Sequence, residues 1–344
     1  MPANLSPEYK AAEAAFRKAH DPNERLAGLR EMLRTIPKHK GTDHLQADIK
    51  SRIKELSEEL DAPKKGPARG APSHVVRPDG AAQLALIGPP NSGKSSLHAR
   101  FTHSNTHVAA YPFTTQIPEP GMMPHEDVHF QLVDLPAVSP EHPVSWLVSA
   151  LQTADACLLV VDLSEASCVE QVQSALTVLR QKHVTLTEYW EPGNGPVGPD
   201  VPDADADADP FALSFPTLIL ANKADLIAGI EEELEVFREL TGLRYPALAV
   251  SASTGEGLGE IGPWLFSHLG IVRVYTKTPG KPPEMERPFT LRRGQKVEDV
   301  ARLVHKDLAH SLKYARLWSR TGIPGQHVGR EHTVVDGDVI ELHT

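Results

Sequence analysis

Short apolar runs separated by polar, helix-compatible segments dominate the middle of this chain. They lie at residues 84–87, 129–133, 157–161, 218–220 and 247–250. Such runs are typical of strands that are buried on both faces of a mostly parallel sheet and are connected by helices. Residues 81–270 are therefore expected to form one doubly wound α/β domain. Residues 191–210 interrupt it with prolines and an Asp-Ala repeat, which predicts a solvated acidic loop.

Before this domain, the spacing of apolar residues changes to that of helices. Leucine and isoleucine recur at three- and four-residue intervals over 26–36 and again over 45–60, with a basic, proline-containing break at 37–42. Asp43 with Gln46 resembles a capping box for the second helix. We expect a helical pair within residues 1–60. The proline- and glycine-rich stretch 61–80 is expected to be a flexible linker.

A third pattern begins after the proline-rich connector. Residues 271–285 are expected to be a linker, and residues 286–344 a small domain of ββαββ type. Within that domain, a strand-like segment at 288–291 precedes an amphipathic helix at 297–308. Asp336-Gly337 between apolar residues predicts a terminal hairpin.

Composition narrows the class of protein. The chain has 344 residues, of which 40% are hydrophobic and 23% charged, and its formal net charge is −10. These values exclude a disordered tail and a disulfide mini-protein, and they argue against a coat protein for nucleic acid. The acidic excess lies in the middle domain, whereas residues 271–344 are mildly basic. Two cysteines, Cys157 and Cys168, and the lack of a signal-like or membrane-spanning apolar run predict a soluble, cytoplasmic protein.

The most informative motif directly follows the first apolar run. Residues 88–96 fit G-x-x-x-x-G-K-[ST] in the strand–loop–helix context that a phosphate-binding loop requires. Glycines let the backbone amides point at phosphate oxygens, and the positive end of the next helix adds to the attraction. Lys94 is expected to reach the β- and γ-phosphates as an electrostatic stabiliser, and Ser95 to ligate Mg²⁺. The expected phosphate-binding residues of this loop are Gly88, Asn91, Ser92, Gly93, Lys94, Ser95 and Ser96.

Three further boxes follow in order, each at the end of an expected strand. The Asp134 carboxylate is placed to hold the magnesium shell through water. Asn222 and Lys223 open a box whose Asp225 carboxylate can accept hydrogen bonds from guanine N1–H and its 2-amino group. Adenine lacks this donor pair, so the box favours GTP over ATP. Ser251 and Ala252 would present backbone amides to the guanine oxygen.

In these motifs the chain resembles GTPases of the Obg superfamily, most of all the developmentally regulated GTP-binding (DRG) proteins. The resemblance is carried by residues 90–95, by Asn222–Asp225, by the C-terminal segment and by Tyr111-Pro112-Phe113-Thr114-Thr115. The last stretch is similar to the first switch of that family. The resemblance implies that Thr115 ligates Mg²⁺ and offers its backbone N–H to the γ-phosphate.

The C-terminal segment resembles a TGS domain, a ubiquitin-like β-grasp module. Its opening at 288–291 and its close from 324–326 to 336–339 match the module's pattern. The family's association with ribosomes implies contact with RNA or ribosomal protein through this domain; no DNA, no membrane and a monomer with partner proteins are expected. Aromatic stacking platforms are not evident in its sequence. Its basic residues are Arg287, Arg292, Arg293, Lys296, Lys306, Lys313, Arg316, Arg320 and Arg330.

The chain departs from the family pattern around the third box. Ala137, which would still offer its N–H to the γ-phosphate, replaces the usual glycine, and Val138 cannot orient a water molecule. The helical insertion of DRG proteins is missing. In related GTPases an asparagine at the position of Asn91 helps to bind a monovalent cation, often K⁺, so the resemblance implies such a site here. No general base can be assigned.

Two functions of different classes remain. The leading one is a Mg²⁺-dependent GTPase with slow intrinsic turnover that acts as a switch in ribosome-linked or translation-linked regulation. The other is a GTP-binding scaffold with negligible hydrolysis, for which Ala137 and Val138 argue. A P-loop ATPase is a third reading, which Asp225 disfavours.

Overall fold

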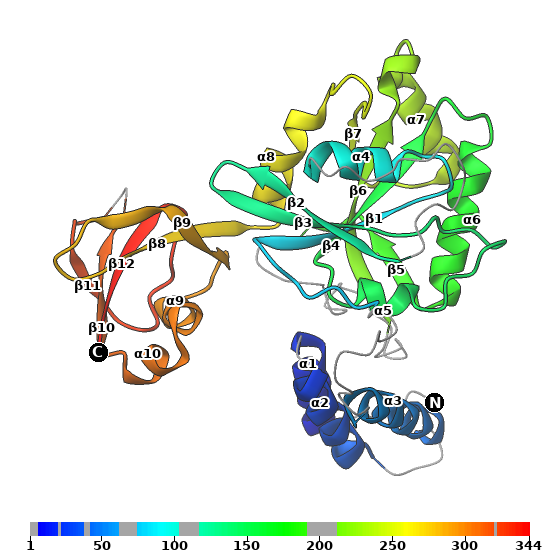
Figure 1. The fold of residues 1–344 in the computed structure, drawn as a ribbon. Coiled ribbons are helices and arrows are strands. Elements are labelled where there is room, and N and C mark those ends of the chain that lie inside the picture. Colours follow the sequence, from blue (N-terminus) through cyan, green and yellow to red (C-terminus); the bar gives the residue numbers. More distant parts are fainter. Residues whose placement is uncertain are drawn as a thin grey trace, which may run out of the picture. The chain divides into compact units, whose positions relative to one another are not determined.

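The computed structural model describes residues 6–19, 22–37, 42–61, 74–102, 117–190, 212–319 and 322–344. The chain divides into two compact units, and the second comprises residues 74–197 and 215–344. Figure 1 follows the chain from the N-terminal helices, through the large sheet, to the C-terminal domain. The Tyr111–Thr115 switch stretch, Thr115 included, and the acidic loop 191–210 lie outside the described residues.

The described residues of the first unit form three helices rather than the expected two: α1 (Pro7–Lys18), α2 (Pro22–Thr35) and α3 (Asp43–Asp61). Tyr9 and Phe16 of α1 pack with Leu29, Met32 and Ile49, so α1 supplies the aromatic part of this core. At the start of α3 it is Thr42, not Asp43, that bonds Gln46: the Gln46 amide donates to Thr42 Oγ1 over 3.1 Å.

The large sheet has strand order β2-β3-β1-β4-β6-β5, with β7 paired to β6. Its core strands β3, β1, β4, β6 and β7 are parallel, and the outer strand β2 runs antiparallel to its neighbour β3. Every residue of β1 and of β4 is buried, which explains their unbroken apolar runs. The strands are β1 (Ala82–Ile87), β2 (Glu119–His125), β3 (Val128–Asp134), β4 (Ala156–Asp162), β5 (Val184–Thr187), β6 (Leu213–Asn222) and β7 (Ala247–Ala249).

Helices flank this sheet, and the mostly parallel α/β class expected from the sequence is confirmed (Figure 1). Leu97 of α4 and Ile261 and Leu265 of α8 pack in one cluster with Leu84, Leu86 and other strand residues. These helices therefore bury one face of β1, while α6 packs against β4 and β5. The helices are α4 (Lys94–Thr102), α5 (Leu147–Leu151), α6 (Cys168–Gln181), α7 (Ile230–Thr241), α8 (Leu258–His268) and the 3₁₀ turn η1 (Ala224–Leu226).

The expected flexible linker 61–80 ends earlier than the sequence suggests. Residues 62–73 are outside the described part of the chain, but residues 74–80 are tied to the large sheet. The Val76 carbonyl accepts hydrogen bonds from Gln83 Nε2 and from Thr153 Oγ1, each over 3.1 Å. The composition of residues 61–80 could not predict this attachment, because the hydrogen-bond donors, Gln83 and Thr153, lie later in the chain.

The C-terminal domain is a five-stranded sheet of order β11-β10-β12-β8-β9 with parallel β12 and β8 side by side. Val297, Val300 and Ala301 of α9 fill one face of it together with inward-facing strand residues such as Ile340. This is the β-grasp arrangement. The elements are β8 (Ile271–Lys277), β9 (Pro283–Arg292), α9 (Val297–Val304), α10 (Lys306–Ser311), β10 (Tyr314–Trp318), β11 (Gln326–Val328) and β12 (Asp338–His343).

Two expectations for this part of the chain are wrong. Residues 271–285 are not a linker, because they contain β8 and the start of β9. The hairpin expected around Asp336-Gly337 does not form: Thr333 bridges to Lys296, and β12 pairs with β8 and β10 instead. In both cases long-range pairing overrides the local signal, since a partner strand offers a full ladder of hydrogen bonds.

Candidate nucleotide-binding site

The loop after β1 has a backbone that most residues cannot adopt. Gly88 has a φ of 147° and Gly93 a φ of 90°, and Asn91 between them is also left-handed at 59°. A Cβ on Gly88 would lie 2.3 Å from the Val160 carbonyl oxygen, and one on Gly93 would lie 2.1 Å from Asn222 Nδ2. Both glycines are therefore required by space as well as by conformation.

Lys94 begins α4 and turns its ammonium back toward this loop. Its Nζ donates to the carbonyl oxygen of Pro89 over 2.9 Å and to that of Gly88 over 3.1 Å. Burial lowers the pKa of Lys94 to about 8, while the Asp134 carboxylate acts in the opposite direction. The loop thus holds a desolvated cation at its mouth, where an anion would be strongly attracted.

Ser95 and Asp134, 39 positions apart, meet beside the loop. Ser95 Oγ donates to Asp134 Oδ2 over 2.6 Å, and Asp134 ends β3 with 1% of its surface exposed. A hydroxyl and a carboxylate are the hard oxygen donors that Mg²⁺ prefers, so the donor set fits this ion. Ser96 follows in α4 and is half-buried.

The segment after β3 is fixed against the end of β1. The Val138 amide donates to the Gly88 carbonyl over 3.1 Å, and the Leu135 amide donates to Leu86 over 3.3 Å. Ala137 and Val138 are both buried. The expected γ-phosphate sensor, Ala137, therefore lies next to the phosphate-binding loop, and the valine at 138 is held as a packing residue.

Asn222 joins the two ends of the candidate site. Its Nδ2 donates to the Ser92 carbonyl over 2.9 Å, and its Oδ1 accepts from the Ala252 amide over 3.0 Å. Gly93 packs directly against it. One buried side chain thus connects the phosphate-binding loop with the Ser251–Ala252 box. The Ala252 amide, expected at the guanine oxygen, bonds Asn222 here.

The base-recognition box lies at the end of β6. Lys223 is left-handed, with a φ of 62°, and Asp225 follows in η1, where it is exposed. The Ala224 amide donates to Val250 and the Val250 amide to Ala221, which ties this turn to β7. Ser251 is fully buried, and its Oγ accepts from the Thr254 amide over 3.1 Å. Asp225 is therefore open to a ligand on a rigid turn.

Asp162, at the end of β4, was missed by the sequence reading. Its Oδ2 pairs with Lys223 Nζ over 2.5 Å, and its Oδ1 accepts from the amide and the hydroxyl of Ser164. Desolvation raises the pKa of Asp162, but the bonds from Lys223 and Ser164 outweigh it and leave the pKa below its usual value. Its position, a lone carboxylate at the carboxyl end of a buried parallel strand, was the available signal.

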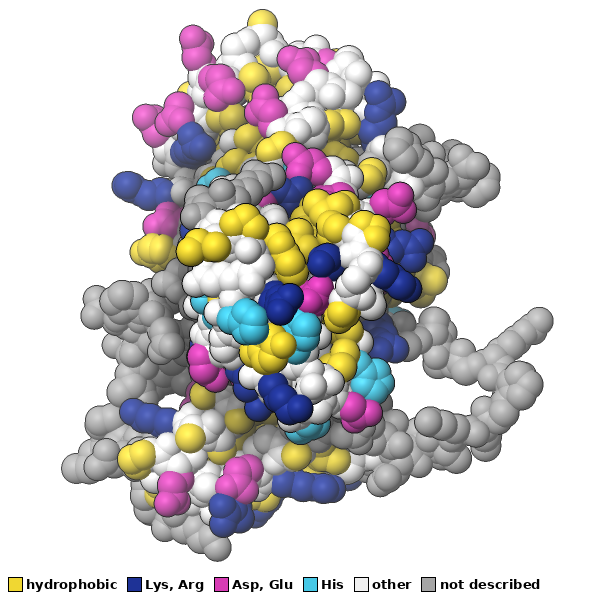
Figure 2. All heavy atoms as spheres, turned by 90° about the vertical axis from the view of Figure 1, so that its left-hand side faces the viewer, with side chains coloured by type: hydrophobic (Ala, Val, Ile, Leu, Met, Phe, Trp, Pro, Cys, Tyr) yellow, Lys and Arg dark blue, Asp and Glu magenta, His cyan; other side chains and the backbone are white. Residues whose placement is uncertain are grey.

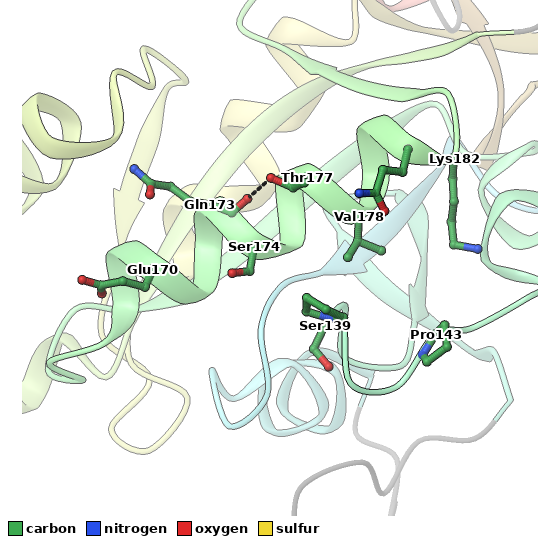
Figure 3. Close-up of a pocket in the computed structure, with 10 residues that line it drawn as sticks. Ser139, Pro143, Glu170, Gln173, Ser174, Thr177, Val178 and Lys182 are labelled. Carbon is green, nitrogen blue, oxygen red and sulfur yellow. Dashed lines mark hydrogen bonds between the residues drawn. The ribbon is translucent and has the colours of Figure 1, made fainter.

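A groove of about 690 Å³ lies next to the segment that follows Ala137. Figure 3 shows α6 on one side of it and the stretch containing Ser139 and Pro143 on the other. The hydrogen bond drawn there runs from Thr177 Oγ1 to the Gln173 carbonyl within α6. None of the residues expected to bind nucleotide lines this groove, so it neighbours the site without being part of it.

Comparisons with known proteins agree with this geometry. The family described as 50S ribosome-binding GTPase matches residues 83–188, and the TGS domain matches residues 272–344. A GTP-binding protein from Pyrococcus horikoshii has a similar fold, with a TM-score of 0.50, 16% identity and coverage of 76% of this chain and 99% of its own. The chain is therefore a P-loop GTPase-class protein with a C-terminal TGS domain.

Curated relatives extend the similarity to nearly the whole chain. An uncharacterized GTP-binding protein of Methanocaldococcus jannaschii is 27% identical over 93% of this chain and 92% of its own length. Human developmentally-regulated GTP-binding protein 2 is 25% identical over 93% of this chain and 98% of its own. The chain is thus similar to the DRG proteins over nearly its whole length, as the sequence motifs indicated.

No helix in the described part of the chain is long and apolar enough to cross a membrane.

Proposed function

We propose that this protein binds GTP with Mg²⁺, hydrolyses it slowly to GDP and phosphate, and acts as a nucleotide switch in ribosome-linked or translation-linked regulation in the cytoplasm. The observation that carries the proposal is the meeting of Ser95 and Asp134, 2.6 Å apart, beside the buried ammonium of Lys94. A hard-cation donor pair and a desolvated cation at one glycine-rich loop are what a nucleoside triphosphate tail requires.

Each part of the site has a role in this proposal. The loop amides and Lys94 neutralise charge on the phosphates, which is the main demand of phosphoryl transfer. A bound Mg²⁺ would supply further neutralisation of the phosphate charge. Ser95 and Thr115 would ligate the ion, and Asp134 would hold its water shell. Asp225 would read guanine through two hydrogen bonds, while Asp162 keeps the Lys223 ammonium in place at the base-recognition turn.

Positioning of the attacking water has no assigned residue, because Val138 is apolar and packed. We therefore expect slow intrinsic turnover, with Asn91 helping to bind K⁺ beside the phosphates. Asn91 is exposed and left-handed at the rim of the loop. Phosphate release should be faster in KCl than in NaCl at equal ionic strength. Equal rates in the two salts would contradict the proposed K⁺ site but not the proposed Mg²⁺-dependent hydrolysis of GTP.

A second function, a GTP-binding scaffold with negligible hydrolysis, is favoured by Ala137 and Val138 together. Single-turnover phosphate release with protein in excess over GTP separates the two. We expect one phosphate per bound GTP in Mg²⁺, and little release by Ser95→Ala. The matched control is Ser174→Ala, on α6 outside the site. Tight GTP binding without release would establish the scaffold.

The partner is proposed to be ribosomal RNA or protein, contacted through the TGS domain. The family description that matches residues 83–188 supports this. A pull-down from lysate with GDP or a non-hydrolysable GTP analogue should recover ribosomal subunits in one nucleotide state more than in the other. Recovery of no subunits in either state would contradict the ribosomal link.

A further inference from the structure

The β10, β11 and β12 strands carry an aromatic ladder on the face of the C-terminal sheet that α9 does not fill. The Tyr314 ring lies between His327 and His343, with ring centroids 4.6 Å apart on each side and interplanar angles of 15° and 9°. The inward residues of these strands, Ala315, Leu317 and Ile340 among them, belong to the α9 core. Alternation along the strands therefore puts the three rings on the opposite face.

The rings come together through strand register, not through sequence proximity. Tyr314 is paired with His343 across β10 and β12, and Arg316 is paired with His327 across β10 and β11. His327 is exposed, and Tyr314 and His343 are half-buried. The ladder is therefore accessible from solvent, and His327 forms its outer end on the edge strand.

Two cationic side chains lie on the same face as the ladder. Arg316 is exposed and its Nε donates to His327 Nε2 over 3.3 Å. Lys277 of β8 lies with its Nζ 4.4 Å from the centroid of the Trp318 ring, which adds a second aromatic surface to the same face. Figure 2 views the molecule from the side of the C-terminal domain, where histidine, lysine and arginine side chains gather around hydrophobic ones.

The single acidic side chain among the outward positions of β10 and β12 is neutralised. Glu341 is 3% exposed and accepts from Lys277 Nζ over 3.0 Å, and its other oxygen lies 2.7 Å from His343 Nε2. This carboxylate therefore fixes the two neighbours and presents little charge outward. The face as a whole offers aromatic rings and the exposed guanidinium of Arg316.

We propose that this aromatic ladder, Tyr314 with His327 and His343 beside Arg316 and Trp318, is a docking surface for single-stranded RNA. Both faces of the Tyr314 ring are covered by the two histidines, so unpaired bases would stack at the ends of the ladder, first on the outer face of the exposed His327. Arg316 would contact a neighbouring phosphate. Stacking tolerates any base, so the surface selects strandedness more than sequence. The inference rests on the proposed RNA partner, and it replaces the expectation that the C-terminal domain has no stacking platform.

Nucleic acid fits this face better than a protein partner does, because the face combines the two features that unpaired RNA needs. Protein interfaces usually centre on desolvated apolar residues, whereas here the centre is an aromatic ladder beside the exposed Arg316, with a carboxylate that is paired to Lys277. A duplex fits poorly, since its bases are not available for stacking.

The test uses the full-length protein in the GDP state and a fluorescein-labelled twelve-nucleotide single-stranded RNA, with fluorescence anisotropy as the readout. We expect saturable binding at about 0.1 M salt. His327→Ala should weaken it by about 10-fold, since stacking contributes about 1–3 kcal/mol per base. Tyr314→Ala removes the ring that supports both histidines and should also weaken binding, whereas Tyr314→Phe should retain it. Arg316→Ala should weaken binding and lower the slope against log salt by about one phosphate contact.

Arg302→Ala on α9 is the matched control, because Arg302 is an exposed cation of the same domain on the helix side. Its affinity for RNA should equal that of the unmodified protein. Thermal melts identify any variant that fails to fold, and Arg316→Ala, an exposed change, keeps the test valid if Tyr314→Ala is unstable.

Three outcomes would overturn the inference: no binding by the unmodified protein, equal affinity for a twelve-base-pair duplex, or tighter binding of single-stranded DNA of the same sequence. Single-turnover GTP hydrolysis by Tyr314→Ala should be unchanged. A protein that hydrolyses GTP but does not bind RNA would contradict only the docking surface, and one that binds RNA but does not hydrolyse GTP would contradict only the proposed enzyme.

Discussion

The nucleotide-binding edge of the large sheet and the aromatic ladder of the C-terminal sheet are built from different materials. At the nucleotide-binding edge, the site depends on a particular backbone conformation, which is held by left-handed Gly93 and by the two bonds of Asn222. On the ladder, the contact groups are side chains from three strands, and the backbone is an ordinary antiparallel pairing.

This difference determines how each region tolerates substitution. A backbone site depends on a few residues that permit one conformation, so a single added methyl group disrupts it. A side-chain site loses only the contacts of the group that is removed, and its strands keep their pairing. A single substitution should therefore have a larger effect on binding at the preformed loop than on the exposed surface.

The largest expected effect is that of Gly93→Ala. Its Cβ would lie 2.1 Å from Asn222 Nδ2, so the loop or Asn222 must move, and the left-handed φ adds strain of about 1–3 kcal/mol. GDP affinity measured by calorimetry should fall by about 100-fold or more. Gly259→Ala, in α8 where an added Cβ meets no atom within 4 Å, is the control and should bind GDP normally. Normal binding by Gly93→Ala would mean that the loop is not preformed.

Asp225→Asn should have a smaller and more selective effect. An amide at this position loses one of two acceptors for the guanine N1–H and 2-amino group, so GDP affinity should fall by about 10- to 100-fold. The new N–H donor can pair with the 2-oxo group of xanthine, so affinity for xanthosine diphosphate should rise. Glu233→Gln, another acidic residue nearby in α7, should change neither affinity. If the ratio of the affinities for GDP and xanthosine diphosphate does not change, Asp225 does not recognise the base.

Asp162→Asn should produce the smallest change, mainly in stability. The ion pair with Lys223 is partly exposed, with the Lys223 side chain 35% accessible, so its contribution is about 1 kcal/mol at pH 7. Because the folded-state pKa of Asp162 lies below its usual value of 3.8, this stability is present above pH 3.8 and is lost as pH falls through the folded-state pKa.

Urea unfolding of the Asp162→Asn variant at several pH values measures this. The difference in unfolding free energy from the unmodified protein should be constant from neutral pH down to about 4 and should shrink below it. Glu170→Gln on α6 is a control of equal charge change. A difference that grows as pH falls would show that the carboxylate is not stabilised by Lys223.

Sequence reading was most successful where chemistry is local. Residues 88–96 form a loop whose conformation is imposed by its own glycines. The strand before this loop is predicted directly by its unbroken apolar run. The order of the boxes along the chain, with each at a strand end, was enough to predict the sheet class and the place of Asp134 and Asn222. Parallel strands bring such ends to one edge whatever the loops between them contain.

Sequence reading failed where pairing is long-range. The stretch 271–285 looked like a linker because of its prolines, yet β8 becomes the parallel neighbour of β12. Asp162 lacked a motif, and its role is visible only through Lys223, 61 positions later. The contacts of residues 74–80 likewise come from the sheet that follows them.

The sequence by itself determined the class of the protein and its glycine-rich loop, and it predicts a preference for guanine, because each is encoded in a short segment that carries its own geometry. The tertiary structure alone decided that Asn222 joins the two ends of the site, that Asp162 holds Lys223, and that Tyr314 lies between two histidines. These arrangements depend on strand register and on contacts between distant residues, and a shift of one position would turn every side chain of a strand to its other face.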